Sequence, residues 1–200
     1  MKRLGVLASG RGSNLRAIHA ATTGPKGVLR GLAEVVVVAS DKPASGALSF
    51  AEKAGVPTIA HPKDGLSRED WDQALVEKLG PYRVDFVVLA GFMRVLSPAF
   101  VTKYPGRIVN VHPADTREHK GLGGYKFAFE KQLSTTKITV HLVDDGLDTG
   151  AILAQRAVDL RGAKTLEEVE RRGLVVEHAL YAETLRDLFR GLRSHEENRE

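Results

Sequence analysis

The chain has 200 residues, of which 42% are hydrophobic and 27% charged, and this length and composition suit one globular domain with a substantial core. It has no cysteine, which excludes disulfides and thiolate metal sites, and no apolar run near the roughly 20 residues that span a membrane. These two absences suit a cytoplasmic protein without a membrane partner, and we expect no nucleic-acid partner, because the net charge of +4 is modest and the basic residues are interspersed with acidic ones.

The first predicted element is an apolar strand at residues 4–8, followed by a glycine turn and an amphipathic helix. Such an arrangement collects backbone N–H groups at a helix N-terminus, where phosphate binds well. Gly12 permits the turn, and Ser13 and Asn14 add side-chain donors. The dinucleotide-binding fingerprint is incomplete, because Leu15 stands where its third glycine belongs. The turn predicts either a phosphate site or only a helix start that Ser13 caps.

A run of valines at residues 34–39 is typical of a strand buried on both faces in a parallel sheet. Strands and helices then alternate, with helices predicted at residues 44–54 and 67–80 and strands at residues 56–60 and 84–89. This alternation indicates a doubly wound parallel sheet.

An apolar loop with one arginine, Arg94, occupies residues 90–97 after the strand at residues 84–89. Loops at the carboxyl ends of parallel strands build the binding sites of open α/β sheets. We therefore interpret this loop either as core lining or as the wall of a pocket for a flat heterocycle with an anionic tail.

Two further strands, at residues 138–143 and 151–158, are joined by a short loop that predicts antiparallel neighbours. A capping box at Thr165 begins a long amphipathic helix, and residues 194–200 form a charged tail. The predicted fold is therefore a single-domain, Rossmann-like three-layer α/β fold over residues 1–193. Its sheet is mostly parallel, with a C-terminal antiparallel portion and a long C-terminal helix.

Three polar side chains form the candidate catalytic site. Asn110 and His112 are two residues apart on a predicted strand that Pro113 ends, so they point to one face. Asp148 lies in the loop after the strand at residues 138–143. Together, an amide, an imidazole and a carboxylate can stabilise an oxyanion and move a proton. Asp148 would favour the protonated form of His112.

The residues of this region also admit other interpretations. A histidine before proline is often only a packed residue, and a zinc site built on the local histidines lacks tight ligand spacing. We interpret His141 as a structural hydrogen-bonding residue within its strand. Asp144 and Asp145 are interpreted as shaping their loop, because the spacing of acids there is too short for a calcium site. We expect no metal.

Five motifs, in order and at compatible spacing, resemble the folate-dependent formyltransferases. They are Gly-Arg-Gly-Ser-Asn-Leu at residues 10–15, Val-Leu-Ala-Gly-Phe-Met-Arg-Val-Leu-Ser-Pro at 88–98, Asn-Val-His-Pro at 110–113, Thr-Val-His at 139–141 and Leu-Asp-Thr-Gly at 147–150. The resemblance covers nearly the whole chain. It implies transfer of a formyl group from 10-formyltetrahydrofolate to the amine of glycinamide ribonucleotide, a step of purine synthesis.

The resemblance also implies residue roles. Asn110, His112 and Asp148 match the family's catalytic residues. The family positions that bind the phosphate of the ribonucleotide correspond to Gly12, Ser13 and Asn14. The position that contacts its ribose corresponds to Glu177. The family positions around the folate correspond to Arg68, Met93, Arg94, Val95, Leu96, Asn110, Val143 and Asp144. The resemblance divides the domain into a phosphate-binding half, residues 1–100, and a folate and catalytic half, residues 101–193. It leaves a monomer or a homodimer open.

Two departures from the family pattern flank the site. Residues 114–124 are charged where the family has an apolar turn, and Lys137-Ile138 stands where the family tends to carry glycine. Two alternative functions therefore stay open: a formyltetrahydrofolate hydrolase, and a weakly active homologue that binds nucleotide or folate. We expect the transferase, because the hydrolases carry an added N-terminal regulatory domain that this sequence does not show.

Overall fold

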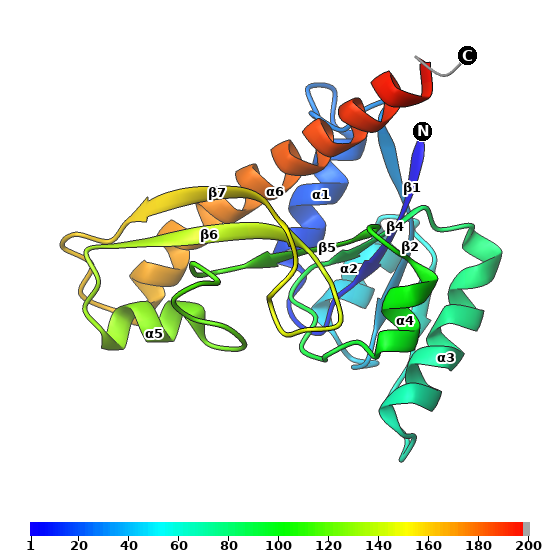
Figure 1. Cartoon of the computed structure of the whole chain (residues 1–200), viewed down its shortest axis with the longest axis horizontal. Coiled ribbons are helices and arrows are strands. Elements are labelled where there is room, and N and C mark those ends of the chain that lie inside the picture. Colours follow the sequence, from blue (N-terminus) through cyan, green and yellow to red (C-terminus); the bar gives the residue numbers. More distant parts are fainter. Residues whose placement is uncertain (198–200) are drawn as a thin grey trace.

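A seven-stranded sheet forms the middle layer of the molecule, and helices cover both of its faces (Figure 1). The structure is a computed structural model that describes the backbone of residues 1–197 and the side chains of residues 1–192. The strand order is β3-β2-β1-β4-β5-β6-β7. The first five strands in this order are parallel to one another, whereas the β5–β6 and β6–β7 pairs are antiparallel. This confirms the predicted three-layer, Rossmann-like fold.

The strands follow the apolar runs of the sequence. Their bounds are β1 Lys2–Leu7, β2 Ala33–Ser40, β3 Thr58–Ala60, β4 Phe86–Leu89, β5 Ile108–His112, β6 Thr135–Leu142 and β7 Ile152–Asp159. β3 begins later than predicted, because Pro57 has no N–H to donate to the ladder. β6 begins earlier than predicted, because the β-branched Thr135 and Thr136 still pair with β7.

Three helices, α2, α3 and α4, begin directly after a serine whose side chain caps them. Their bounds are α1 Ser13–Thr23, α2 Gly46–Lys53, α3 Arg68–Leu79, α4 Pro98–Lys103, α5 Gly124–Glu130 and α6 Leu166–Glu197, with a 3₁₀ turn, η1, at Gly80–Tyr82. The hydroxyls of Ser45, Ser67 and Ser97 accept hydrogen bonds from the third residue after them. α4 and α5 were not predicted individually, because less than two turns gives no clear helical period.

The long helix α6 begins where the sequence predicts. The Thr165 hydroxyl accepts a hydrogen bond from the Glu168 N–H at 3.2 Å, as a capping residue does. The helix continues to Glu197, so residues 194–197 of the predicted charged tail are helical, and residues 198–200 lie outside the described residues. α6 packs along α1, α5, β6 and β7 on one face of the sheet (Figure 1).

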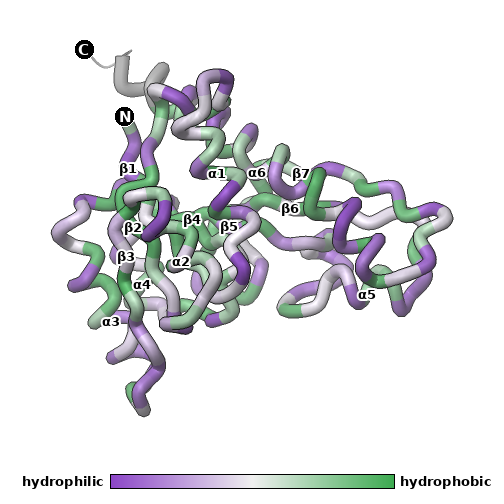
Figure 2. Tube along the Cα trace, turned by 180° about the vertical axis from the view of Figure 1, so that it is seen from behind, coloured by the Kyte–Doolittle hydropathy of each residue, from purple (hydrophilic) through white to green (hydrophobic). Residues whose placement is uncertain are grey.

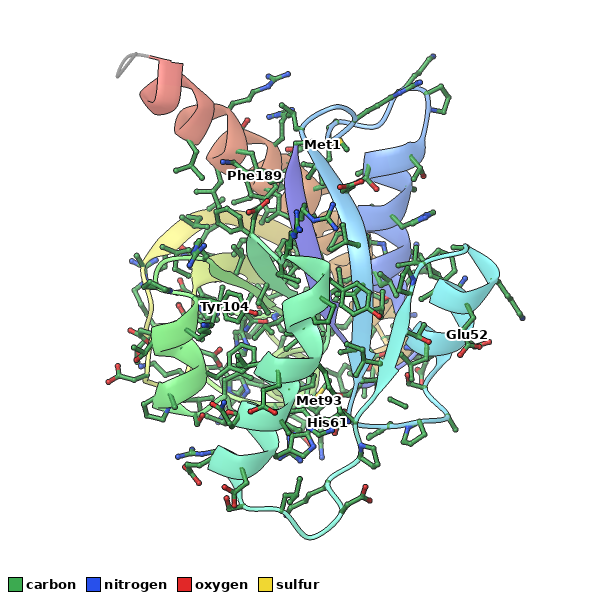
Figure 3. The ribbon with its side chains drawn as sticks, turned by 90° about the vertical axis from the view of Figure 1, so that its right-hand side faces the viewer. Met1, Glu52, His61, Met93, Tyr104 and Phe189 are labelled. Atoms are coloured by element: carbon green, nitrogen blue, oxygen red, sulfur yellow. The ribbon has the colours of Figure 1, made fainter. Side chains whose placement is uncertain are left out.

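Alternate residues of the central strands fill two hydrophobic cores, one on each face of the sheet. Leu4 and Val6 of β1 face α1, α2 and α6, whereas Leu7 faces α3 and α4. Tyr104, next to α4, and Phe189, on α6, therefore lie in different cores (Figure 3). In Figure 2 the hydrophobic segments gather along the central strands, and the hydrophilic ones along the surface loops.

The strand order reverses between β1 and β4, and the loops after these two strands diverge there. At such a switch point an open α/β sheet binds its ligands outside the carboxyl ends of the strands. The Ser9 hydroxyl joins the two loops, since it accepts a hydrogen bond from the Met93 N–H at 3.0 Å. The fold therefore places the candidate site between the loop after β1 and the loops after β4 and β5.

Candidate active site

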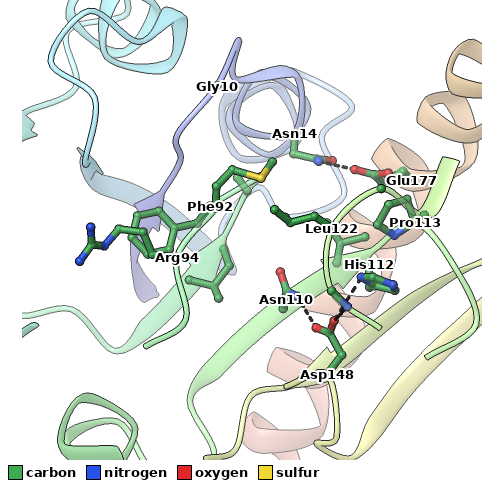
Figure 4. Close-up of a pocket in the computed structure, with 18 of the residues that line it drawn as sticks. Gly10, Asn14, Phe92, Arg94, Asn110, His112, Pro113, Leu122, Asp148 and Glu177 are labelled. Atoms are coloured by element: carbon green, nitrogen blue, oxygen red, sulfur yellow. Dashed lines mark hydrogen bonds and ion pairs between the residues drawn. The ribbon is translucent and has the colours of Figure 1, made fainter. Parts of the chain in front are cut away.

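A cleft of about 620 Å³ opens at the switch point. Its lining comes from the loops after β1, β4 and β5, from the loop between β6 and β7, and from α5 and α6. Figure 4 shows the start of α1 on one side of the cleft and the Asn110, His112 and Asp148 cluster on another. The cleft thus brings together segments that lie far apart in the sequence.

The catalytic cluster is built on the pleat of β5 and β6. Asn110 lies opposite His141 in the antiparallel register, and His112 lies opposite Thr139. Because side chains alternate along a strand, all four project from one face of the sheet, and Val109 and Val111 project into the core on the other. The spacing that predicted a shared face for Asn110 and His112 is therefore observed.

The loop between β6 and β7 carries Asp148 to this face. Its Oδ2 lies 3.5 Å from Nδ1 of His112, and its Oδ1 lies 3.4 Å from Nε2 of His141. Asp148 also accepts a hydrogen bond from the Gly121 N–H at 2.8 Å. Its backbone is left-handed, with φ of 50°, and such uncommon conformations gather at functional sites. The three predicted catalytic residues therefore meet.

Asn110 is held by the same cluster. Its side-chain nitrogen lies 3.2 Å from Nε2 of His141 and 3.5 Å from Oδ1 of Asp148. The His141 Nδ1 lies 2.8 Å from the Leu142 carbonyl, which only accepts, so Nδ1 carries a proton and donates to this carbonyl. His141 is thus a hydrogen-bonding residue, as interpreted, but it orients the candidate catalytic amide.

The electrostatics of Asp148 keep it ionised. Burial alone would raise the pKa of Asp148, but hydrogen bonds from His141 and Gly121 and the charges of His112 and His141 lower it to about 2. At neutral pH the cluster therefore holds a carboxylate that can accept a proton or fix an imidazole.

His112 behaves differently from the sequence-based expectation. Its Nε2 donates to the His119 carbonyl at 3.0 Å, and both Asp148 and this carbonyl raise the pKa of His112. Burial lowers the pKa of His112 by more, so the pKa lies below its ordinary value of 6.5. Asp148 thus favours the protonated form of His112, as expected, but burial of this side chain, which is only 4% exposed, opposes that effect.

On the other side of the cleft, the turn after β1 ends in Gly12, which precedes α1 and has a left-handed φ of 79°. No side chain caps α1, so the alternative in which Ser13 only caps a helix is not what the structure shows. The first N–H groups of a helix have no partner within the helix. Gly12, Ser13 and Asn14 all line the cleft, as an anion site at this helix start requires.

Asn14 and Glu177 join α1 to α6 at the cleft. The Asn14 side-chain nitrogen donates to Oε1 of Glu177 at 2.5 Å, and the Tyr125 hydroxyl donates to Oε2 at 2.5 Å. Burial raises the pKa of Glu177, although these two hydrogen bonds lower it. Oδ1 of Asn14 is buried without a hydrogen-bond partner among the described residues. This corner therefore offers polar groups to a ligand.

An apolar wall completes the cleft. Met93 and Val95 in the loop after β4, with Leu122 and Leu147 facing them from other loops, line the cleft and are all about half exposed or more. Arg94 stacks its guanidinium on the Trp71 ring, with its Cζ 4.1 Å from the ring centroid. Exposed apolar side chains that gather at a cleft mark a site for an apolar ligand surface.

Most of the predicted binding residues line the cleft. The folate-side residues that do so are Met93, Arg94, Val95, Leu96, Asn110, Val143 and Asp144. Arg68 does not: it is the first residue of α3 and forms an exposed ion pair with Glu69 at 3.0 Å. Asp144 also shapes its loop as expected, since it accepts hydrogen bonds from Gly146 and Thr149.

Two further site groups, Tyr125 and the Gly121 N–H, have no marker in the local sequence. The partner of Tyr125, Glu177, is 52 residues away. The contact of the Gly121 N–H with Asp148 likewise depends on tertiary structure. Within the described residues, no group of three histidine, aspartate or glutamate side chains is arranged to hold a metal ion.

These features define an α/β enzyme whose cleft joins a helix start suited to anions with an amide, imidazole and carboxylate suited to carbonyl chemistry. The family model described as formyl transferase matches residues 2–185. The chain therefore belongs to the formyl transferase family, and the resemblance in its motifs is confirmed.

Two relatives illustrate the match. The chain is 33% identical over 189 residues to phosphoribosylglycinamide formyltransferase of Bacillus subtilis, with 94% of this chain and 95% of the relative covered. It is 41% identical over 187 residues to the trifunctional purine biosynthetic protein adenosine-3 of Chironomus tentans. That alignment covers 92% of this chain but only 13% of the relative, so the chain matches one part of a much longer protein.

Solved structures agree with these relatives. Glycinamide ribonucleotide transformylase 1 from Symbiobacterium toebii superposes with a TM-score of 0.88 at 37% identity, covering 96% of this chain and 89% of that one. Phosphoribosylglycinamide formyltransferase from Bacillus halodurans gives a TM-score of 0.87 at 35% identity, covering 94% and 95%. No helix among the described residues is long and apolar enough to cross a membrane.

Proposed function

We propose that the chain transfers a formyl group from 10-formyltetrahydrofolate to the amine of glycinamide ribonucleotide. The observation that carries this proposal is the meeting of Asn110, His112 and Asp148 in a cleft that also holds the start of α1. The match along 95% of a relative named phosphoribosylglycinamide formyltransferase supports the choice of substrate.

In this proposal the ribonucleotide lies between α1 and α6. Its phosphate accepts hydrogen bonds at Gly12, Ser13 and Asn14, where the helix N-terminus favours negative charge. Its ribose hydroxyls meet the Glu177 carboxylate, which Asn14 and Tyr125 hold in place. This arrangement leaves the amine free to extend toward Asn110.

The folate lies on the other side of the cleft. Its flat ring packs against the apolar wall of Met93 to Leu96, and its polar ring edge meets the loop from Val143 to Asp148. Arg94 is held on Trp71 and supplies a positive charge near the anionic end of the co-substrate. In this proposal Arg68 also meets that anionic end, and the domain divides at residue 100 into a phosphate-binding half and a folate and catalytic half.

The neutral amine attacks the formyl carbon, a C–N bond forms, and the carbonyl oxygen becomes an alkoxide. Asn110 and His112 donate hydrogen bonds to this oxygen, and removing one such donor typically costs about 100- to 1000-fold in rate. The C–N bond to the folate then breaks. The proton lost by the amine reaches the folate nitrogen through Asp148, His112 or water.

Burial lowers the pKa of His112, which disfavours the protonated ring in the free protein. In this proposal the ring becomes charged by taking up the proton that the attacking amine loses. The developing oxyanion and Asp148 favour this charged form, and the ring gives the proton to the folate nitrogen as the C–N bond breaks. This places the positive charge of His112 in the transition state rather than in the free protein.

One assay tests the function. The protein is incubated with 10-formyltetrahydrofolate, with and without glycinamide ribonucleotide, and folate release is followed by absorbance. We expect release only when the ribonucleotide is present. Release without the amine would instead show the hydrolase, and binding without release would show an inactive homologue. A cytoplasmic location and a monomeric or homodimeric state remain predictions of the same account.

A further inference from the structure

Asp115 is a buried charge in the loop that departs from the family pattern. Its side chain is only 4% exposed and accepts hydrogen bonds from three residues. Arg117 donates from its backbone N–H and its guanidinium, Lys137 donates at 2.8 Å, and Gln155 donates at 3.1 Å. These partners hold the pKa of Asp115 well below its usual range, although burial alone would raise it.

The partners of Asp115 come from two strands of the antiparallel hairpin. Lys137 and Thr139 lie on β6, and Gln155 lies opposite Thr139 on β7. Gln155 donates to the Thr139 hydroxyl at 2.8 Å, and that hydroxyl donates to the Ala114 carbonyl at 2.7 Å. The two departures noted in the sequence, the charged loop and Lys137, therefore meet in one ion pair that fastens the loop to the sheet.

The fastened loop contacts two of the three candidate catalytic side chains, His112 and Asp148. The Asp115 carbonyl accepts hydrogen bonds from the N–H groups of Glu118 and His119, which closes a turn. The next carbonyl beyond that turn, on His119, accepts the Nε2–H of His112 at 3.0 Å. Two residues later the Gly121 N–H donates to Asp148 at 2.8 Å.

We propose that Asp115 is a positioning residue of the active site. Held by Lys137 and Gln155, it fixes the loop of residues 114–124 so that the loop backbone orients the ring of His112 and the carboxylate of Asp148. The sheet end of this network is rigid, because Lys137 and Gln155 lie within paired strands. Catalytic groups keep their geometry only when such supporting contacts hold them.

The kinetic effects expected from this role of Asp115 rest on the proposed function. The direct test of the role uses no substrate. The test is the titration of the His112 ring by NMR in the protein and in Asp115→Asn. The titratable side chains that act on His112 are Asp148, His119 and His141, and the variant changes none of them. Burial is the largest influence on His112, so releasing the loop should raise its pKa toward 6.5.

Asp159→Asn is a matched control. Asp159 accepts from the backbone N–H and guanidinium of Arg161, two residues on, as Asp115 does from Arg117, but it is exposed and lies at the end of β7 rather than in the loop of residues 114–124. The His112 titration should be unchanged in this control. Lys137→Met is a milder second variant, because Lys137 is 40% exposed, and it should shift His112 in the same direction if Asp115→Asn fails to fold.

The kinetic expectation is specific to a positioning role. In Asp115→Asn, kcat should fall about 10- to 100-fold, the scale expected when catalytic groups are misplaced by about 1 Å. The KM for glycinamide ribonucleotide should stay near the wild-type value, because α1 and Glu177 are untouched. Asp115→Glu, which keeps the charge, should recover part of kcat. An unchanged or lowered His112 pKa in folded Asp115→Asn and Lys137→Met would overturn the proposal.

Discussion

Asp148 is the residue through which the cluster is joined, since it contacts His112, His141, Asn110 and the Gly121 N–H. Replacing Asp148 by Asn keeps the shape but removes the charge and one acceptor. We predict that kcat falls about 100- to 10,000-fold, the range attributed to positioned proton-transfer groups. The KM for glycinamide ribonucleotide should change little. Steady-state kinetics with both substrates measures this.

Asp145→Asn is the control for that variant, because Asp145 is exposed in the same loop and does not line the cleft. It should keep normal turnover. A kcat within a few-fold of the wild type in Asp148→Asn would show that this carboxylate has no part in the chemistry.

Tyr125 lies at the other end of the cleft, where it contacts Glu177. Its hydroxyl holds Oε2 of Glu177, and its ring lies against Gly173, where an added Cβ would come within 2.1 Å. Tyr125→Phe removes only the hydroxyl and leaves Glu177 oriented by Asn14 alone. We predict a KM for the ribonucleotide raised about 10-fold, since hydrogen bonds to charged groups contribute about 1.5–3 kcal/mol.

The matching control for Tyr125 is Phe127→Leu, which changes a ring of the same helix outside the cleft lining. This substitution should leave the KM for the ribonucleotide unaltered. If Tyr125→Phe raised only the KM for the folate, Tyr125 would be assigned to the wrong ligand.

The start of α1 is the element on which the phosphate site depends. Gly12 has a φ of 79°, and a Cβ added there would lie 2.9 Å from the Cα of Ala47. Gly12→Ala should therefore destabilise the protein by about 1–3 kcal/mol through backbone strain and this close approach. It should also weaken binding of inorganic phosphate. Denaturant unfolding with and without phosphate measures both effects.

Gly10→Ala is its partner experiment. A Cβ at Gly10 meets nothing within 4 Å, so the free energy of unfolding and phosphate binding should be nearly unchanged. Equal stability of the two variants would mean that the turn does not require its left-handed glycine.

At the scale of elements, the sequence predicts most of this fold because its strands are runs of valine, leucine and isoleucine with helices between them. Serine at position 67 and threonine at position 165 predict the starts of α3 and α6 correctly. α4 and α5 could not be predicted individually, since a helix of less than two turns gives no clear helical period.

The candidate site also has some features that the sequence predicts and others that it does not. The geometry of Asn110 and His112 follows from strand period, and local motifs place Gly12 and Asp148 near strand ends. The contacts of Tyr125 with Glu177 and of Asp115 with Lys137 join distant segments, so no local pattern reveals them. The downward shift of the His112 pKa could not be predicted either, because it arises from burial of the side chain in the folded protein.

For the whole molecule, Asp148 links stability to pH. Its pKa is about 2 in the folded protein and 3.8 ordinarily, so the folded state favours the carboxylate. This stabilisation is present above pH 4 and is lost as the pH falls toward 2, an effect of about 2 kcal/mol. The difference in free energy of unfolding between wild type and Asp148→Asn should therefore shrink at acid pH.

Denaturant unfolding of both proteins at about pH 6 and about pH 2.5 measures this difference. Using the difference removes the contributions of the other carboxylates, which both proteins share. A difference that stays constant across this range would mean that Asp148 has an ordinary pKa in the folded protein.

The central claim is that the cleft passes a formyl group from folate to a ribonucleotide amine. It is tested most directly by giving the protein 10-formyltetrahydrofolate with an isotopically labelled formyl group, together with glycinamide ribonucleotide, and locating the label by NMR. The account predicts labelled formyl on the ribonucleotide nitrogen with wild-type protein, and almost none with His112→Ala. Label recovered as free formate, or transferred equally well by His112→Ala, would contradict it.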